Sequence, residues 1–127
     1  NGGVIYPASH YGRDALVGVG LFLSHFVAEG KSMTALKATY PQYFISKNKL
    51  TLSPDMDVDK ILEGLKEKYA SEEITDIDGV KIDFKDGWVH LRKSNTEPII
   101  RIYSESKDEA AANRLAEEVI KVAKSLY

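Results

Sequence analysis

Hydrophobic and polar residues follow a regular order along most of the chain, and their spacing predicts its elements. Four segments alternate in the manner of half-buried strands: 43–52, 80–84, 89–91 and 100–103. Two others repeat hydrophobic residues at helical spacing: 57–70 and 108–125. Asp86-Gly87, between the second and third strands, is a strong hairpin signal. We therefore expect an α+β fold with a four-stranded, mostly antiparallel sheet and two helices on one of its faces.

A separate apolar segment lies near the start of the chain. We expect a helix from Asp14, whose carboxylate suits the first turn of a helix, to Glu29, with Gly30 ending it. Its hydrophobic residues surround most of the helix: Leu16, Val17, Val19, Leu21, Phe22, Leu23, Phe26 and Val27. Such a helix needs neighbours on most sides, and the few residues before it cannot supply them. The pattern indicates that further protein covers this helix.

The other N-terminal elements are short, namely a strand at 4–6 and a helix at 33–39 that Ser32 caps. The chain also begins in a glycine-containing loop rather than at a methionine, so we expect it to be part of a longer protein. We place a domain boundary after residue 41. Residues 1–41 are then the end of an α/β domain, and residues 42–127 are a complete α+β domain.

Composition narrows the possible functions. Seventeen basic residues stand against nineteen acidic ones, a net charge of −2, whereas a nucleic-acid-binding domain normally carries a basic surplus. The absence of cysteine excludes disulfides and thiolate metal sites, and it makes a cytoplasmic location the expected one. The longest nearly apolar run, 15–26, is too short to cross a bilayer. A single phosphate could still be bound, because two or three local cations suffice for that.

The connection between the last two predicted strands carries the most unusual group of side chains. Two arginines, Arg92 and Arg101, flank the polar residues Ser94, Asn95 and Thr96. Hydroxyl and backbone N–H groups donate hydrogen bonds to phosphate oxygens, and a guanidinium can add a bidentate pair of hydrogen bonds. If the two strands pair, both guanidiniums can face one point. The segment is a candidate anion-binding loop, and the alternative is a solvated hairpin loop made of common turn residues.

The order of the residues favours anion binding, because it resembles a known motif. Arg-Lys-Ser-Asn-Thr-Glu-Pro at residues 92–98, followed by Arg101, is similar to the phosphate-binding loop of the α-D-phosphohexomutases. That family includes phosphomannomutase/phosphoglucomutase and phosphoglucosamine mutase. Asn1-Gly2-Gly3 is similar to the end of the sugar-binding loop in the family's third domain. The resemblance covers the whole order of elements and implies a C-terminal domain like the TATA-box-binding protein in fold.

The resemblance implies an enzyme that moves phosphate between the C1 and C6 oxygens of a hexose. In that family a phosphoserine gives its phosphoryl group to the substrate, which becomes a bisphosphosugar, and the other phosphate then returns to the serine. By this resemblance, five residues hold the phosphate that is not reacting: Arg92, Ser94, Asn95, Thr96 and Arg101. Glu97 would orient an arginine, and Asn1 would contact sugar hydroxyls.

The reacting groups of the implied enzyme lie in earlier domains. The family's phosphoserine and its aspartate-rich Mg²⁺ loop are absent here, so we expect no catalytic residue, no metal ligand and no activity in this chain alone. Asp55, Asp57 and Asp59 resemble part of a calcium loop. However, Lys60 and Lys66 replace the glycine and the glutamate that such a loop needs. The implied partners are a phosphorylated hexose and the N-terminal domains, without nucleic acid or membrane.

The three histidines give no support to a hydrolytic site. His25 lies within the apolar helix and is expected to be packed. His90 shares a strand face with Trp88 and Arg92, and His10 precedes a turn. None of the three has a serine and a carboxylate at a spacing that suggests a catalytic triad.

A second hypothesis is a free-standing α+β module that binds a phosphorylated ligand without catalysis. The apolar helix from Asp14 discriminates between the two, because a self-sufficient module should not expose such a surface. Nucleic-acid binding through the open sheet face has Trp88 and Tyr103 as candidates, but Glu105 and the negative charge weaken it. Asn95 favours the phosphomannomutase/phosphoglucomutase pattern, since many phosphoglucosamine mutases carry glycine there.

Overall fold

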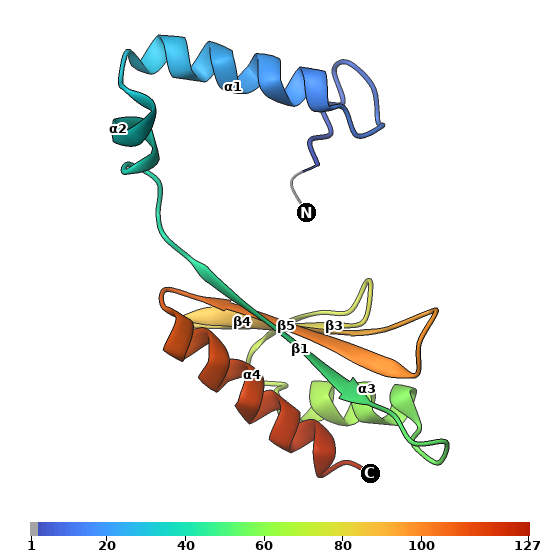
Figure 1. Cartoon of the computed structure of the whole chain (residues 1–127). Coiled ribbons are helices and arrows are strands. Elements are labelled where there is room, and N and C mark those ends of the chain that lie inside the picture. The colour runs from blue at the N-terminus through green and yellow to red at the C-terminus, as the bar shows by residue number, and fades with distance from the viewer. Residues whose placement is uncertain (1–2) are drawn as a thin grey trace. The chain divides into compact units, whose positions relative to one another are not determined.

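Residues 3–127, the part of the chain that the computed structural model describes, belong to two units that divide after Pro41. Figure 1 shows the elements of the first unit, Asn1–Pro41, and of the second, Gln42–Tyr127. In the described part, no helix is both long enough and apolar enough to cross a membrane. Because Asn1 lies outside the described residues, so does its predicted contact with sugar hydroxyls.

The second unit is built on a five-stranded sheet. Its strands are β1 (Phe44–Thr51), β2 (Glu73–Thr75), β3 (Val80–Phe84), β4 (Gly87–Lys93) and β5 (Ile99–Ser106). They lie in the order β1-β5-β4-β3-β2, and every neighbouring pair is antiparallel. The predicted count of four strands is therefore one too low. The missed strand, β2, has only three residues, which are too few to show an alternating pattern.

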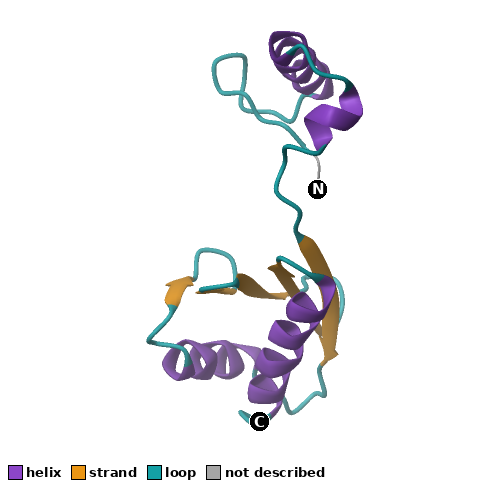
Figure 2. Cartoon of the chain, turned by 90° about the vertical axis from the view of Figure 1, so that its left-hand side faces the viewer, coloured by secondary structure: helices purple, strands orange, loops and turns teal. Residues whose placement is uncertain are grey.

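Two helices, α3 (Val58–Lys68) and α4 (Glu109–Lys124), cover one face of this sheet, as Figures 1 and 2 show. Each begins at an aspartate whose side chain accepts backbone N–H groups of the first turn, Asp57 for α3 and Asp108 for α4. The other face of the sheet carries no helix of this unit. The predicted α+β class, with two helices on one face of an antiparallel sheet, is confirmed.

The core lies between the helices and the sheet. Alternate strand residues are fully buried there: Val80, Ile82, Val89, Leu91, Ile100 and Ile102. Ile61 and Leu65 of α3 and Val119 and Ala123 of α4 pack against them. Burying a large aliphatic side chain contributes about 1.5–3 kcal/mol, so this pattern fixes which way each strand faces. The residues between the buried ones, Arg92 and Arg101 among them, must project from the helix-free face.

The hairpin between β3 and β4 differs from the predicted one in its turn. Its loop is Lys85-Asp86, and Gly87 already pairs with Phe84 as the first residue of β4. Gly87 does not have a positive φ. A Cβ at this position would instead lie 2.2 Å from the backbone carbonyl oxygen of Glu105. Glycine is thus required by the close approach of β5 and not by the conformation of the turn.

The first unit contains two helices, α1 (Ala15–Glu29) and α2 (Met33–Lys37). Asp14 caps α1, because its Oδ1 accepts hydrogen bonds from the N–H groups of Leu16 and Val17 at 2.8 and 3.0 Å. Gly30 ends the helix in the left-handed conformation, with a φ of 60°, which glycine adopts without strain. The predicted helix from Asp14 to Gly30 is confirmed.

The surface of α1 is uncovered within the described residues. None of its residues is buried, and the side chains of Leu16 and Val27 are 83% and 76% exposed. His25 is exposed as well, and its ring stacks on Tyr40 at 6.5 Å between centroids. The expectation that His25 is packed inside the protein is therefore wrong for this structure, because the contact with Tyr40 leaves His25 exposed.

The predicted strand at residues 4–6 does not form. Tyr6 makes only an isolated bridge with His10, because its carbonyl oxygen accepts the N–H groups of Ser9 and His10 in a tight turn. His10 then fixes the following residues. Its Nδ1 accepts the N–H of Gly12 at 3.0 Å, and its Nε2 lies 3.0 Å from the carboxylate of Asp14. His10 is thus a structural residue of the turn that leads into α1.

Candidate anion-binding loop

The two arginines of the predicted loop stand side by side in the sheet. Arg92 near the end of β4 and Arg101 near the start of β5 are direct partners in the antiparallel ladder. Paired residues project from the same side of a sheet. Because Leu91 and Ile102, the next pair, are buried under the helices, both guanidiniums lie on the helix-free face. The condition that both cations can face one point is met.

Backbone hydrogen bonds hold the loop between these strands. The N–H of Ser94 donates to the carbonyl oxygen of Ile99 at 3.0 Å, and the N–H of Ile99 donates to that of Glu97 at 2.8 Å. The carbonyl oxygen of Pro98 accepts the N–H of Leu52, the residue after β1, at 2.9 Å. These three bonds fix the path of the loop without using any of its polar side chains.

The hydroxyl groups of the loop lie close together. Ser94 Oγ accepts the N–H of Thr96 at 3.4 Å and lies 3.5 Å from Thr96 Oγ1. Six residues line a surface cavity of about 310 Å³: Arg92, Lys93, Ser94, Asn95, Thr96 and Arg101. The structure therefore gathers all five predicted residues around one concavity and adds Lys93. Its volume lies at the lower end of the range for small-molecule sites.

A carboxylate accompanies each arginine. Arg92 Nη1 lies 2.9 Å from Asp78 Oδ2, and Arg101 Nη2 lies 3.5 Å from Glu97 Oε2. All four side chains are largely exposed, and exposed ion pairs contribute only about 0–1 kcal/mol to stability. These pairs therefore restrict where the guanidiniums point more than they stabilise the fold.

Asp78 is a residue of this site that sequence reasoning missed. Its backbone carbonyl oxygen lies 2.7 Å from Nε2 of His90 on β4. The next residue, Gly79, has a φ of 81°, and a Cβ there would lie 2.1 Å from the carbonyl oxygen of Leu91. Only glycine allows the turn to press against β4 and bring Asp78 to Arg92. The Asp-Gly dipeptide at 78–79 was the available signal, but the pairing with Arg92 spans fourteen residues.

The acidic residues near α3 have structural positions. Asp57 accepts the N–H groups of Asp59 and Lys60 as the N-cap of α3, and Asp55 lies 3.5 Å from the hydroxyl of Ser53. Among residues 3–127, no three histidine, aspartate or glutamate side chains are grouped so that they could hold a metal ion. The described residues thus do not fit the Mg²⁺ that the resemblance implies for the whole enzyme.

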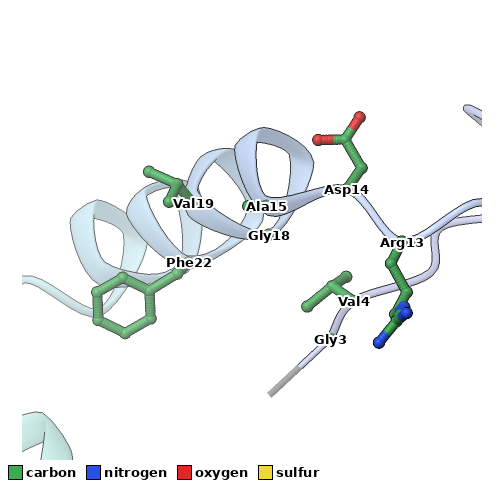
Figure 3. Close-up of a pocket in the computed structure, with 8 residues that line it drawn as sticks. All are labelled: Gly3, Val4, Arg13, Asp14, Ala15, Gly18, Val19 and Phe22. Carbon is green, nitrogen blue, oxygen red and sulfur yellow. The ribbon is translucent and has the colours of Figure 1, made fainter. Parts of the chain in front are cut away.

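A second cavity, of about 640 Å³, lies in the first unit and is mainly apolar. Figure 3 shows its lining residues, with Val4 on one side and the side chains of Val19 and Phe22 on α1. The segment at Val4 comes close to the helix at Gly18, where a Cβ would lie 3.1 Å from Val4 Cγ2. The cavity thus lies between the start of α1 and the segment that precedes it.

The fold and the loop together define a small α+β domain that presents a cationic loop at one end of its sheet. The family model "Phosphoglucomutase/phosphomannomutase, C-terminal domain" matches residues 47–122. The chain therefore belongs to the phosphoglucomutase/phosphomannomutase family, and the resemblance seen in the loop sequence is confirmed.

Proteins similar to this chain are considerably longer than it. It is 41% identical to the phosphoglucosamine/phosphogalactosamine mutase of Sulfurisphaera tokodaii and 40% identical to the phosphoglucomutase/phosphomannomutase of Thermococcus kodakarensis. Each match covers 96% of this chain but 27% of the relative. A solved structure of a phosphoglucomutase/phosphomannomutase family protein from Burkholderia thailandensis matches with a TM-score of 0.66 and 26% identity, over 97% of this chain and 27% of that one. The chain thus spans about a quarter of the length of these relatives.

Proposed function

We propose that this chain is the C-terminal part of a phosphohexomutase and that its loop holds the substrate phosphate that is not reacting. The whole enzyme would interconvert hexose 1-phosphate and hexose 6-phosphate in the cytoplasm through a phosphoserine and a bisphosphosugar. One observation carries the proposal: Arg92 and Arg101 are partners on one sheet face, and the hydroxyl-bearing loop between them lines the same cavity. The names of the relatives, which are mutases, support it.

The chemistry of the cavity suits a phosphate monoester, which carries about two negative charges at pH 7. Hydrogen bonds can come from the hydroxyls of Ser94 and Thr96 and from the side-chain amide of Asn95. Each guanidinium can donate a bidentate pair of hydrogen bonds. A hydrogen bond to a charged group contributes about 1.5–3 kcal/mol. Several such bonds fix the distant end of the substrate, and phosphoryl transfer depends mainly on that positioning and on charge neutralisation.

The first unit has a different part in this proposal. We infer that residues 1–41 are the end of the third, sugar-binding domain and that Asn1 contacts sugar hydroxyls there. The exposed apolar side chains of α1 and the cavity beside Val4 would then be covered by the preceding part of that domain. In this arrangement the serine nucleophile and the ligands of Mg²⁺, which would supply positive charge for phosphoryl transfer, lie outside this chain.

The alternative of a free-standing binding module is less well supported. A self-sufficient domain rarely exposes an apolar surface as large as that of α1, and the relatives are about four times as long as this chain. For the substrate, Asn95 favours phosphomannose or phosphoglucose. The identities of 41% and 40% to relatives named for different sugars favour neither.

Titration of the isotope-labelled chain with glucose 6-phosphate, followed by NMR, tests the role of the loop. The backbone amide signals of Ser94, Asn95 and Thr96 should shift in a saturable way, with weak affinity, because the other domains are absent. Unphosphorylated glucose is the control and should leave these signals in place. If the three signals do not move, or move equally with glucose, the loop does not bind the phosphate.

A further inference from the structure

Three cations form a row across three neighbouring strands of the helix-free face. Lys49 on β1 is the ladder partner of Arg101 on β5, and Arg101 is the partner of Arg92 on β4. Like charges that lie directly opposite each other destabilise a sheet. A row of three such residues therefore needs negative charge beside it, which carboxylates of the protein or a bound anion can supply.

The carboxylates nearby do not balance the row. Arg92 pairs with Asp78 and Arg101 pairs with Glu97, so each arginine is neutralised by its own partner. Lys49 is exposed and makes no ion pair with any residue in the described range. The row therefore keeps one uncompensated positive charge, that of Lys49. A phosphate monoester, which carries about two negative charges at pH 7, would be attracted to it.

We propose that Lys49 is a further phosphate-binding residue, which contacts the anion held by the loop from the side of β1. This inference rests on the proposed function of the loop and adds a residue to it. Partners in an antiparallel ladder have Cβ atoms about 4.5–5.5 Å apart, a gap that the flexible four-carbon stem of lysine spans. The ammonium group donates hydrogen bonds to the phosphate oxygens that the two guanidiniums leave free.

Lys47 provides a matched comparison on the same strand. It projects from the same face two residues away and is also exposed, but its ladder partner is Tyr103 and not an arginine. Its Nζ lies 5.8 Å from the centroid of the Tyr103 ring, a cation–π contact. Lys47 is thus engaged by the protein and lies about 7 Å further along the strand, away from the loop.

The test compares the affinity of four forms of the 127-residue chain for inorganic phosphate and for glucose 6-phosphate: wild type, Lys49→Gln, Lys49→Arg and Lys47→Gln. The loop amide signals report binding by NMR. Lys49→Gln should raise Kd for both ligands about 5- to 20-fold and make Kd less sensitive to salt, because one charge-assisted contact is lost. Lys49→Arg should keep Kd within about threefold of wild type, since the charge remains.

The outcomes separate this inference from the proposed function. If the wild-type loop does not respond to either ligand, both the loop assignment and the role of Lys49 fail. If wild type and Lys49→Gln bind equally well, only the role of Lys49 fails. If Lys47→Gln weakens binding as much as Lys49→Gln does, both lysines act through long-range electrostatic attraction. Lys49 then makes no specific contact with the anion. Thermal unfolding of each variant verifies that the exposed substitutions leave the fold intact.

Discussion

His90 and Asp78 are joined at the edge of the cationic loop, with Nε2 of His90 2.7 Å from the backbone carbonyl oxygen of Asp78. The same aspartate holds Arg92 through its carboxylate, 2.9 Å from Nη1. His90 on β4 therefore fixes the backbone of Asp78. Asp78 in turn directs the guanidinium of Arg92, which is also on β4. Because the turn at 78–79 fits against β4 only with glycine at its second position, the backbone there should tolerate little change.

Gly79→Ala should destabilise the second unit by about 2 kcal/mol or more. Its φ of 81° is unfavourable for alanine, and the new Cβ would meet the carbonyl oxygen of Leu91 at 2.1 Å. The measurement is the denaturant concentration at which half of the protein is unfolded, followed through the NMR signals of the sheet residues. Gly20→Ala in α1 is the control, because nothing lies within 4 Å of its Cβ position and alanine favours a helix by about 0.5–1 kcal/mol. A Gly79→Ala protein as stable as wild type would show that the turn adjusts freely.

Arg101→Ala should weaken the binding of glucose 6-phosphate about tenfold or more, because it removes a charge-assisted contact. The free energy of unfolding should change by less than about 1 kcal/mol, since the pair with Glu97 is largely exposed. Arg114→Ala, on the exposed surface of α4, is the matched control and should leave Kd unchanged. Unchanged affinity of the Arg101 variant would remove this residue from the site.

The chain alone should show no interconversion of glucose 1-phosphate and glucose 6-phosphate. In the proposed enzyme the serine that carries the phosphoryl group lies in another domain, so the loop can bind but not react. A coupled assay for glucose 6-phosphate measures the turnover, with a complete phosphoglucomutase as the positive control. Turnover by the chain above the background rate would mean that the reacting groups are within residues 1–127.

The cap of α1 should weaken in acid. The hydrogen bond from His10, together with those from the N–H groups of Val17 and Leu16, holds the pKa of Asp14 below its ordinary value of 3.8. A lowered pKa means that the folded state favours the carboxylate. The stabilisation is therefore complete well above pH 3.8 and is lost as the pH falls through the lower folded pKa.

The NMR signals of the Leu16 and Val17 amides measure this titration, and their midpoint should lie below pH 3.8. Asp14→Asn is the control, because asparagine also caps helices but does not titrate in this range. A midpoint at or above 3.8 in the wild-type protein would show that these contacts do not favour the ionised form of Asp14.

Elements with local signals were predictable from the sequence. Asp14 and Gly30 mark both ends of α1, and the spacing of Ile61 and Leu65 marks the buried face of α3. The grouping of the loop residues around one cavity was predictable too, because the strands on either side of the loop alternate and bring Arg92 and Arg101 to the same face. Each of these signals lies within a dozen residues of the feature that it predicts.

Features that depend on distant parts of the chain were not predictable. The strand β2 has a single inward residue, Ile74, and forms only because β3 supplies an edge for pairing. The glycine at 87 was attributed to its own turn. Glycine is needed there because a Cβ would collide with the backbone carbonyl oxygen of Glu105. Likewise, the position of Lys49 beside Arg101 follows from the register of β1 on β5, which no local pattern contains.

The loop between β4 and β5 keeps its path through three bonds that involve only backbone atoms, at Ser94, Ile99 and Pro98. These three bonds do not depend on the side chains that face the cavity. Substitutions at Asn95 or Thr96 should therefore leave these three bonds in place. The side chains around the cavity could thus change one at a time while the backbone of the loop keeps the same course.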